Sequence, residues 1–285
     1  EEKSRSEMYD EALDDLSKKF YMLDPLFFGD MKFLICYAAA EWKVGFYAID
    51  GTSEAASKPS PLFSQIPIGK PLRLQPNSVI IFDYTSVTKE VSIKSLPYAD
   101  DINSRIKFLS SMYACARGCL SLVQAEENSP TICYVEGSKV YQLKMKTRGK
   151  RASPENENQL QIMTKHVLVG LECLHKGGFV HRDIKLSNIL YVIFDNPANS
   201  SYVLIDFEHG GKSGEKMTEL LKCWDDGTLD RKKYTKMSDI YQLGKLLEEF
   251  LIMIKSEEGR DFIVKLKRKE MDASEALKHP WLINL

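Results

Sequence analysis

The chain has 285 residues, of which 44% are hydrophobic and 28% are charged, and its formal net charge is −1. A chain of this size and composition can bury one large core or two smaller lobes. A net charge so close to zero excludes a global field that would attract nucleic acid or an acidic membrane surface. We therefore expect neither a nucleic-acid partner nor a membrane partner.

Cysteine usage predicts free thiols. The six cysteines include no C-x-x-C pair, and no histidine-rich segment accompanies them, so neither a disulfide framework nor a zinc site is indicated. Cys115 and Cys119 are four residues apart on a predicted helix, and a metal or redox pair there is the less favoured alternative. The remaining cysteines are Cys36, Cys133, Cys173 and Cys223.

No segment has the pattern of a membrane anchor. The longest apolar run, residues 33–40, is too short to cross a bilayer. No signal peptide is visible, although residue 1 is Glu and not Met, so a targeting segment can have been removed. We expect a soluble chain that is intracellular where it acts.

Residues 1–66 are predicted to form an N-terminal extension. A charged, amphipathic helix is expected over residues 5–19, and two strands over 31–39 and 43–50. The Ser- and Pro-rich residues 53–67 predict an exposed connector. A strand pair buries its apolar face most simply on the lobe beside it, so the extension is expected to brace the next lobe. A dimer surface or an inhibitory segment are the alternatives, and both a monomer and a homodimer stay open.

Residues 67–145 predict a small antiparallel sheet that carries one helix. Three strands are expected in PLRLQ, SVIIFDYT and KEVSIKSL, and two more in TICYVEG and KVYQLKM. Between these groups, residues 99–117 place apolar side chains at helical spacing, and Asp100 and Asp101 are placed to cap that helix. The apolar positions are Ile102, Ile106, Leu109, Tyr113 and Ala116.

Residues 146–285 predict a larger, mainly helical lobe. A helix is expected to start at Ser-Pro-Glu (residues 153–155) and to end at Gly177-Gly178. A hairpin follows in YVIF and YVLI, then a second buried helix in MSDIYQLGKLLEEFLIMI. Asp272 and Glu275 predict a capping box near the end. The predicted fold class is therefore α+β, with a sheet-rich lobe followed by a helical lobe.

The segment FVHRDIKLSNIL carries the most specific pattern in the chain. His181, Arg182, Asp183, Lys185 and Asn188 occupy all five fixed positions of H-R-D-x-K-x-x-N. In a chain of this length, chance gives such a match with odds on the order of one in ten thousand. Phosphoryl transfer needs magnesium on the phosphates, a cation on the nucleotide, and a group that orients and deprotonates the attacking hydroxyl. The alternative is a capped loop whose buried His and Asp only hold their own backbone.

With this loop and the VLIDFEHGG that follows it, residues 70–285 resemble the eukaryotic protein kinase family. The resemblance implies a two-lobed kinase fold, with Asp183 as the catalytic base and Lys185 in contact with the transferring phosphate. Asn188 and Asp206 would hold Mg²⁺ or Mn²⁺, and ATP would be the phosphoryl donor. A lysine at position 185 is the usual serine/threonine-kinase arrangement.

Two further matches support the resemblance. Val91-Ser92-Ile93-Lys94 is similar to the V-A-I-K strand, which indicates Lys94 as the nucleotide-binding lysine, although an isolated strand lysine is more often a solvated edge. Asp239 in SDIYQLG resembles the aspartate of the buried helix that anchors the catalytic loop. His181 would brace the same loop.

Arg182 marks a kinase that can be switched by a phosphate on its activation segment, which runs from Asp206 to about residue 236. We predict autophosphorylation in or near this segment, with Arg182 paired to whichever side chain is modified. Each candidate is also an ordinary polar loop residue. The candidates are Ser213, Thr218, Thr228, Tyr234 and Thr235.

Three departures from the family pattern bear on whether the chain is active. No glycine lies between Gly69 and Gly118, so the glycine-rich loop is missing, and the turn at Pro76-Asn77 is expected in its place with fewer free N–H groups. Residues 102–125 contain no acidic side chain to pair with the nucleotide lysine. Glu208 replaces the glycine of Asp-Phe-Gly, which restricts the backbone but retains Asp206.

The order of these segments is similar to the kinase domains of the Crinkler (CRN) effectors of oomycetes and fungi. The similarity rests on the glycine-poor small lobe, HRDIKLSN, IDFEH and SDIYQLGKLL. It implies a secreted protein that acts in the cytoplasm or nucleus of a host cell. Residues 146–151 (KTRGKR) would then be a nuclear signal, while the simpler interpretation is a solvated hinge loop.

The sequence therefore predicts an ATP- and Mg²⁺-dependent serine/threonine protein kinase with an unspecified protein substrate. A pseudokinase is favoured by the missing glycine loop and helix glutamate, and is opposed by the retained base and metal ligands. A small-molecule phosphotransferase of the aminoglycoside type would share Asp183 and Asn188 but usually lacks the equivalents of Arg182 and Lys185.

Overall fold

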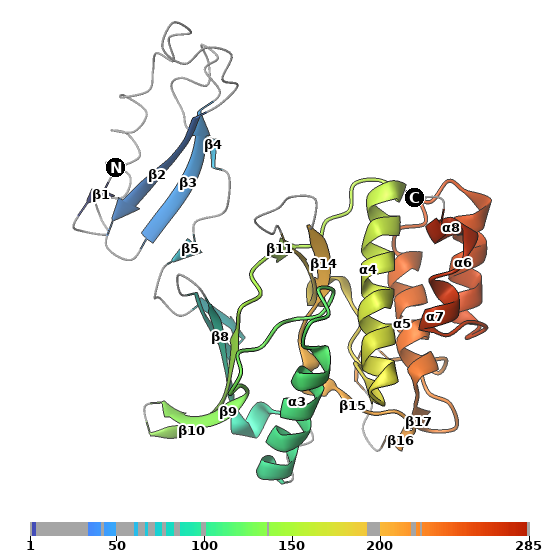
Figure 1. The fold of residues 1–285 in the computed structure, drawn as a ribbon, viewed down its shortest axis with the longest axis horizontal. Helices are drawn as coiled ribbons and strands as arrows, with labels where there is room; N and C mark the ends of the chain where they lie inside the picture. The colour runs from blue at the N-terminus through green and yellow to red at the C-terminus, as the bar shows by residue number, and fades with distance from the viewer. Residues whose placement is uncertain are drawn as a thin grey trace, which may run out of the picture. The chain divides into compact units, whose positions relative to one another are not determined.

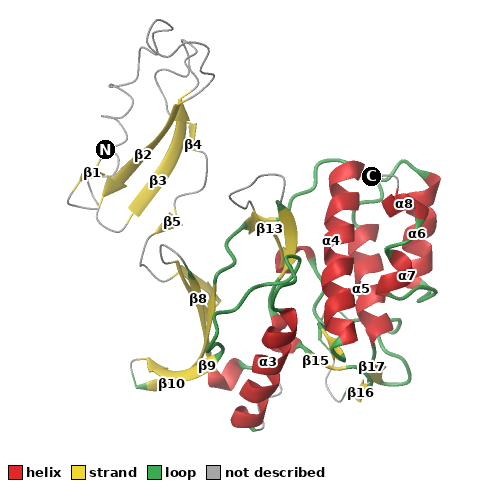
Figure 2. Cartoon of the chain, in the orientation of Figure 1, coloured by secondary structure: helices red, strands yellow, loops and turns green. Residues whose placement is uncertain are grey.

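The computed structural model divides into two compact units, Glu1–Lys89 and Glu90–Leu285. It describes residues 86–97, 101–135, 137–192, 200–217, 221–222 and 224–283, together with the short strands before residue 86 that are given below (Figures 1 and 2). The predicted division into an extension, a small lobe and a large lobe stays a prediction.

The first unit contains an antiparallel strand pair of the predicted kind. β2 (Leu34–Ala40) pairs with β3 (Lys43–Ile49) along its whole length, with Leu34 opposite Ile49. The strands predicted over 31–39 and 43–50 are thus confirmed. The flanking strands are β1 (Glu2–Lys3), which is parallel to β2, and β4 (Ser60–Pro61) and β5 (Ile66–Pro67), which pair with β3. The helix predicted over 5–19 lies outside the described residues.

A second antiparallel pair in this unit lies in the region where the sequence lacks a glycine-rich loop. β6 (Leu72–Gln75) pairs with β7 (Ser78–Phe82), with Leu72 opposite Ile80 and Gln75 opposite Ser78. The two strands were predicted. The turn expected at Pro76-Asn77 lies outside the described residues.

The second unit begins with the predicted sheet and helix. β8 (Val87–Ser92) crosses the unit boundary and leads into a short 3-10 helix, η3 (Ile93–Ser95). Helix α3 (Ile102–Ala116) follows. β9 (Thr131–Val135) and β10 (Ser138–Met145) then form an antiparallel hairpin, and β10 is the sheet neighbour of β8.

Helix α3 has the cap and most of the buried face that its sequence predicts. The Asp101 carboxylate accepts a hydrogen bond from the backbone N of Asn103. Leu109, Tyr113 and Ala116 are buried as expected, because they recur at helical spacing. Arg105 is buried on the same helix, which the apolar pattern did not predict.

The larger part of the second unit is built on helix α4 (Glu157–Lys176). The five apolar side chains that define its predicted face have no exposed surface; they are Leu160, Met163, Val167, Leu171 and Leu174. The predicted start at Ser-Pro-Glu is wrong by a few residues. The helix begins after Asn156, whose side chain accepts from the backbone N of Gln159 and so supplies the cap.

Short strands surround the segment that carries the kinase-like motif. β11 (Lys150–Arg151), β13 (Ile189–Val192) and β14 (Ser201–Leu204) form one sheet, which contains the predicted hairpin. β12 (Phe179–Val180) pairs with β15 (Gly211–Lys212), and β16 (Glu215–Lys216) pairs with β17 (Lys233–Tyr234). Two 3-10 turns lie between them, η4 (Leu186–Asn188) and η6 (Phe207–His209).

Four helices complete the unit (Figure 1). They are α5 (Lys236–Glu248), α6 (Glu257–Lys267), α7 (Ala273–Ala276) and α8 (Pro280–Ile283). Helix α5 packs on α6, and α4 packs on α7 and α8. The capping box predicted for Asp272 and Glu275 is confirmed, with both backbone-to-carboxylate bonds at 2.9 Å. The antiparallel sheet with one helix, followed by a helical region, confirms the predicted α+β class.

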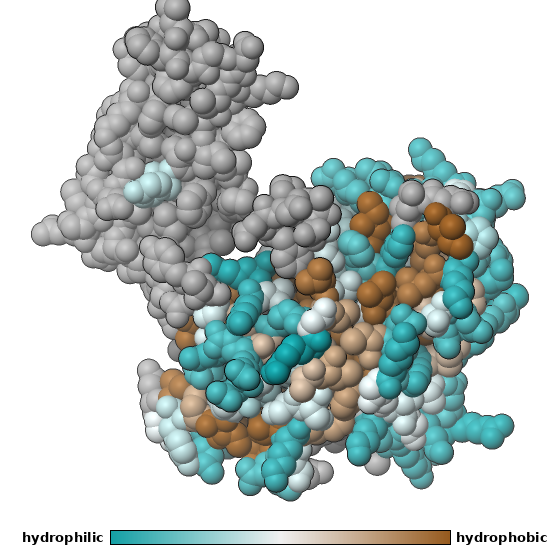
Figure 3. All heavy atoms as spheres, in the orientation of Figure 1, coloured by the Kyte–Doolittle hydropathy of each residue, from teal (hydrophilic) through white to brown (hydrophobic). Residues whose placement is uncertain are grey.

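The face of the second unit drawn in Figure 3 carries hydrophilic residues with hydrophobic ones between them. Exposed apolar residues of the chain include Leu120, Tyr134 and Ile252. None of the helices in the described ranges combines the length and the apolar character that a membrane span needs.

Candidate active site

Asp239 anchors the HRD segment from inside helix α5. Its carboxylate accepts from the backbone N of His181 and of Arg182, both at 2.9 Å. It also accepts from the Tyr234 hydroxyl at 2.7 Å and lies 2.9 Å from His175 Nε2. Burial alone would raise the pKa of Asp239, but the hydrogen bond and charge of His175, with the other donors, hold this pKa below its ordinary value. A fully buried carboxylate thus fixes the start of the loop.

Two more side chains fix the backbone of the loop. Gln242 accepts from the backbone N of Ile184 at 2.8 Å and donates to the carbonyl O of Arg182 at 3.1 Å. Trp224 Nε1 donates to the same carbonyl at 2.9 Å. These bonds hold Arg182 at a φ of 72°, a left-handed conformation that a non-glycine residue adopts only when its surroundings enforce it. The loop is therefore rigid where it presents Asp183.

The Asp183 carboxylate is held between a lysine and an amide. Lys185 Nζ lies 2.7 Å from Asp183 Oδ2. Asn188 Nδ2 donates both to that oxygen and to the Asp183 carbonyl, each at 2.9 Å. Burial alone would raise the pKa of Asp183, but the hydrogen bond and charge of Lys185, followed by His181 and Asn188, lower it. Asp183 is therefore an ionised hydrogen-bond acceptor at neutral pH.

The segment that carries Asp206 is bonded directly to this loop. The Ile205 backbone N donates to the Asn188 carbonyl, and His181 Nε2 donates to the Ile205 carbonyl, both at 2.9 Å. Asp206 itself has a φ of 74°. Phe207, next in the chain, is buried between two rings. Its ring centroid lies 4.8 Å from that of Tyr113 and 5.5 Å from that of His181. The structure thus brings Asp206 and Asn188 to neighbouring positions.

Asp206 and Asn188 fit a magnesium ion by their chemistry. Mg²⁺ prefers oxygen ligands and is usually held by one or two carboxylates together with substrate phosphates. Because both contacts of the Asn188 amide nitrogen go to Asp183, its amide oxygen is turned away from that residue. Within the described ranges, no group of three or more His, Cys, Asp or Glu side chains could enclose a metal alone. The pair therefore suits a metal that is shared with a nucleotide.

Helix α3 reaches the same segment through an arginine that sequence reasoning missed. Arg105 Nη2 donates to the carbonyl O of Glu208 at 2.6 Å, and Arg105 is only 7% exposed. The Glu208 side chain, in the position of the family's glycine, is buried as well. The sequence did contain a signal for Arg105: it is a cation four residues before Leu109, so helical spacing places it on the apolar face of the helix.

Lys94 does not lie on a strand, so that part of its prediction is wrong. Strand β8 ends at Ser92, because the backbone N of Leu96 donates to the Ile93 carbonyl at 3.2 Å and closes the turn η3. Lys94 is exposed on this turn and forms no ion pair with any residue that the structure describes. Lys89, by contrast, lies within β8 and is half-buried. A nucleotide-binding role for Lys94 stays a prediction.

The candidate phosphorylation sites are mostly enclosed. Thr228 and Tyr234 have no exposed surface, and the Thr235 hydroxyl donates to Asp230 at 2.7 Å. Ser213 is half-buried, and Thr218 lies outside the described residues. In the structure, Arg182 forms an ion pair with Glu215, which is not one of these candidate positions.

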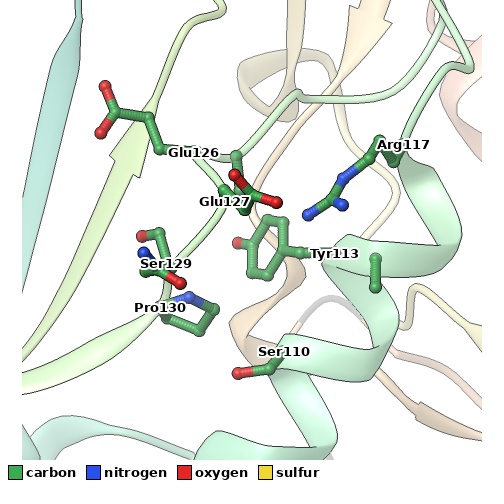
Figure 4. A pocket seen from close by; sticks show the side chains of 10 residues that line it. Ser110, Tyr113, Arg117, Glu126, Glu127, Ser129 and Pro130 are labelled. Carbon is green, nitrogen blue, oxygen red and sulfur yellow. The ribbon is translucent and has the colours of Figure 1, made fainter.

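One cavity lies outside this constellation. It has a volume of about 390 Å³ and lies between the C-terminal half of α3 and residues 125–130. Figure 4 shows Arg117 and Glu127 reaching into it from these two sides, with Tyr113 at its wall. None of the predicted catalytic or metal-binding residues lines this cavity.

Comparison with known proteins agrees with the site geometry. Residues 120–254 match the model of the protein kinase domain. The chain is 28% identical over 189 residues to "Probable serine/threonine-protein kinase 2" of Plasmodium falciparum, which covers 60% of this chain and 33% of that protein.

Two further relatives carry related names. The "Serine/threonine-protein kinase US3 homolog" of Gallid herpesvirus 2 is 28% identical over 58% of this chain and 40% of its own length. "Ribosomal protein S6 kinase alpha-6" of Mus musculus is 38% identical over 34% of this chain and 13% of its own length. The chain thus spans well under half of each of these relatives. The matched model, the α+β fold and the anchored HRD loop together show that residues 120–254 carry a protein kinase domain, with distant serine/threonine kinase relatives.

Proposed function

We propose that the chain is an ATP- and Mg²⁺-dependent serine/threonine protein kinase domain that transfers the γ-phosphate to a protein hydroxyl. The observation that carries this proposal is the Asp183 carboxylate, buried and held by Lys185 and Asn188 beside the Asp206 segment. A rigid acceptor next to two oxygen ligands is the arrangement that phosphoryl transfer needs. A binding module has no use for it.

Each residue of the loop has a role in this proposal. Asp183 would accept a hydrogen bond from the substrate hydroxyl and take its proton as that oxygen bonds to the γ-phosphorus. The bond between the γ-phosphorus and the bridging oxygen breaks in the same step, and ADP leaves with that oxygen. Its lowered pKa makes it a weak base, so its main work is to orient the hydroxyl. Lys185, with a side chain 48% exposed, can contact the transferring phosphoryl group. Magnesium, when bound by Asn188 and Asp206, supplies charge neutralisation at the phosphates.

The preference for serine and threonine rests on Lys185 and on the names of the relatives, which include serine/threonine-protein kinases. The protein substrate and any autophosphorylation are part of the proposal. The effector role in a host cell, which the Crinkler resemblance implies, also belongs to the proposal. The relatives add no support to it.

A pseudokinase is the second candidate, and two observations favour it. Lys94 is exposed, without an ion pair among the residues that the structure describes. Glu208 places a buried side chain where the family has glycine. In this case the chain would bind nucleotide, or a partner, without transferring phosphate.

The test is labelling with γ-labelled ATP and Mg²⁺ or Mn²⁺, on a generic protein substrate and on a panel of small hydroxyl compounds. We expect the parent to label protein, Asp183→Asn to abolish labelling, and the control Asp226→Asn, at an exposed carboxylate, to label like the parent. Lys94→Ala tests whether this lysine serves the nucleotide. An unlabelled parent whose melting temperature still rises with nucleotide is a pseudokinase. Labelling of small hydroxyl compounds alone indicates a small-molecule phosphotransferase.

A further inference from the structure

Arg182 is a buried cation with an acidic partner already in place. Its side chain is 3% exposed, and its Nη2 forms an ion pair with Glu215 Oε2, whose side chain is 47% exposed. The same Glu215 oxygen accepts from the backbone N of Lys212 at 3.3 Å. Because a buried guanidinium is costly without a counter-charge, this carboxylate stabilises the arginine in its buried position.

The segment around Glu215 is tied to the catalytic loop at both ends. Residues 211–212 pair with β12, the strand that leads into His181. Glu215 lies on β16, opposite Tyr234 of β17. The Tyr234 hydroxyl bonds to Asp239, and its ring lies 5.8 Å from the Arg182 guanidinium. Glu215 therefore joins the activation segment to the same network that fixes the HRD backbone.

The space around the Arg182 guanidinium is closely fitted. A Cβ added to Gly211 would lie 2.0 Å from Arg182 Cζ, so the arginine packs directly on the glycine backbone. A cavity of about 390 Å³ lies beside it, lined by Arg105, Lys216 and Asp101 as well as by Arg182 and Glu215. Cations outnumber carboxylates in this lining. Removing Glu215 would leave the remaining Asp101 among three cations.

We infer that Glu215 is the positioning residue that supplies, within the chain, the negative charge Arg182 requires, so that the HRD loop is held without phosphorylation of the activation segment. This inference rests on the proposed kinase function only for its effect on rate. The enclosed state of Thr228 and Tyr234 and the Asp230 bond of Thr235 agree with it, because none of these hydroxyls has to be modified to satisfy Arg182.

The experiment uses the full chain after phosphatase treatment, with the absence of phosphate verified by intact mass. We compare the parent with Glu215→Gln, which removes the charge at constant size, and with Glu215→Asp, which keeps it. Asp226→Asn is the matched control, since it removes one exposed carboxylate from the same segment. We expect the phosphate-free parent to stay active, and Glu215→Gln to lower kcat about tenfold with little change in the KM for ATP, as for a lost charge-assisted hydrogen bond. Glu215→Asp should retain more activity than Glu215→Gln.

A second readout does not depend on catalysis. Hydrogen exchange at residues 180–183 and 211–217 should be faster in Glu215→Gln than in the parent, and unchanged in Asp226→Asn. If the parent is inactive but exchange responds in this way, the proposed function fails and the positioning role stands. The inference is overturned if Glu215→Gln matches the parent in exchange, or if the phosphate-free parent becomes active only after phosphorylation.

Discussion

Arg105 of helix α3 donates a hydrogen bond from Nη2 to the carbonyl O of Glu208 at 2.6 Å. The bond joins the helix to the turn that begins directly after Asp206, and the stacked rings of Tyr113 and Phe207 join the same two elements. In the protein kinase family, this helix is expected to supply a glutamate that pairs with the nucleotide-binding lysine. In this chain an arginine supplies the connection, and its acceptor is a backbone carbonyl, so it does not depend on a lysine partner.

Replacing Arg105 should therefore loosen the Asp206 segment. We expect Arg105→Met, which keeps an aliphatic stem of similar length, to lower the free energy of unfolding by about 1–3 kcal/mol, because a buried carbonyl loses its donor. Lys107→Met, at an exposed position of the same helix, is the control. Urea denaturation measures both. Equal stabilities of the two variants would show that the bond to Glu208 contributes little.

Asp239 should dominate the stability of the catalytic loop. In Asp239→Asn, the amide nitrogen must face donors on His181, Arg182 or Tyr234, so at least one buried donor loses its acceptor. Breaking a buried charged network from one side costs about 3–5 kcal/mol. We expect a loss of this order in denaturant unfolding at pH 7. A loss below the cost of a single surface hydrogen bond would contradict the assigned anchoring role.

The same residue gives a pH dependence with a defined sign. The pKa values of Asp239 and Asp183 are lowered in the folded state from the ordinary 3.8. Their contribution to stability is therefore fully present above 3.8 and is lost as pH falls through the lower, folded-state pKa values. We expect parent and Asp239→Asn to converge in stability as pH falls below 3.8. A stability difference that stays constant down to pH 2 would exclude this linkage.

The catalytic loop was predictable because its information is contiguous. His181, Asp183, Lys185 and Asn188 lie within one short segment, and their mutual bonds follow from that spacing. The buried faces of α4 and the core of α5 were predictable for a related reason, since helical periodicity marks them residue by residue.

The contacts that Arg105 and Arg182 make with the activation segment were not predictable, because their partners are distant in sequence and have no common pattern. Arg105 and Glu208 are 103 positions apart, and the acceptor is a carbonyl that any residue could provide. Glu215 stands 33 positions after Arg182 in a polar segment, where nothing distinguishes it from other carboxylates. Lys94 was misplaced because strand propensity continues past Ser92, while the turn before Pro97 ends the strand.

The thiols of Cys115 and Cys119 should react slowly in the folded state. Burial raises the pKa of Cys119 to about 11 and also raises the pKa of Cys115, whose Sγ lies 3.7 Å from the Cys173 carbonyl O. Only the thiolate is nucleophilic, so alkylation of Cys119 at pH 8 should be on the order of 10³-fold slower than for a fully ionised thiol. Mass spectrometry of iodoacetamide adducts against pH measures this. Rapid labelling of Cys119 at neutral pH in the native chain, at the rate seen in urea, would instead favour a reactive redox pair.

Tyr234 should act as a structural donor and not as a site of modification in the folded chain. Its side chain has no exposed surface, and its hydroxyl donates to Asp239 at 2.7 Å. A phosphate there would place a second negative charge against a buried carboxylate, which is strongly unfavourable. We expect Tyr234→Phe to cost about 1–2 kcal/mol of stability through the lost bond to a charged acceptor, and to leave the pattern of phosphopeptides after incubation with ATP unchanged. Urea denaturation and peptide mapping measure the two effects. Disappearance of a phosphopeptide in Tyr234→Phe would show that the segment opens enough to expose this ring, and the network around Asp239 would then be a closed state that phosphorylation can disrupt.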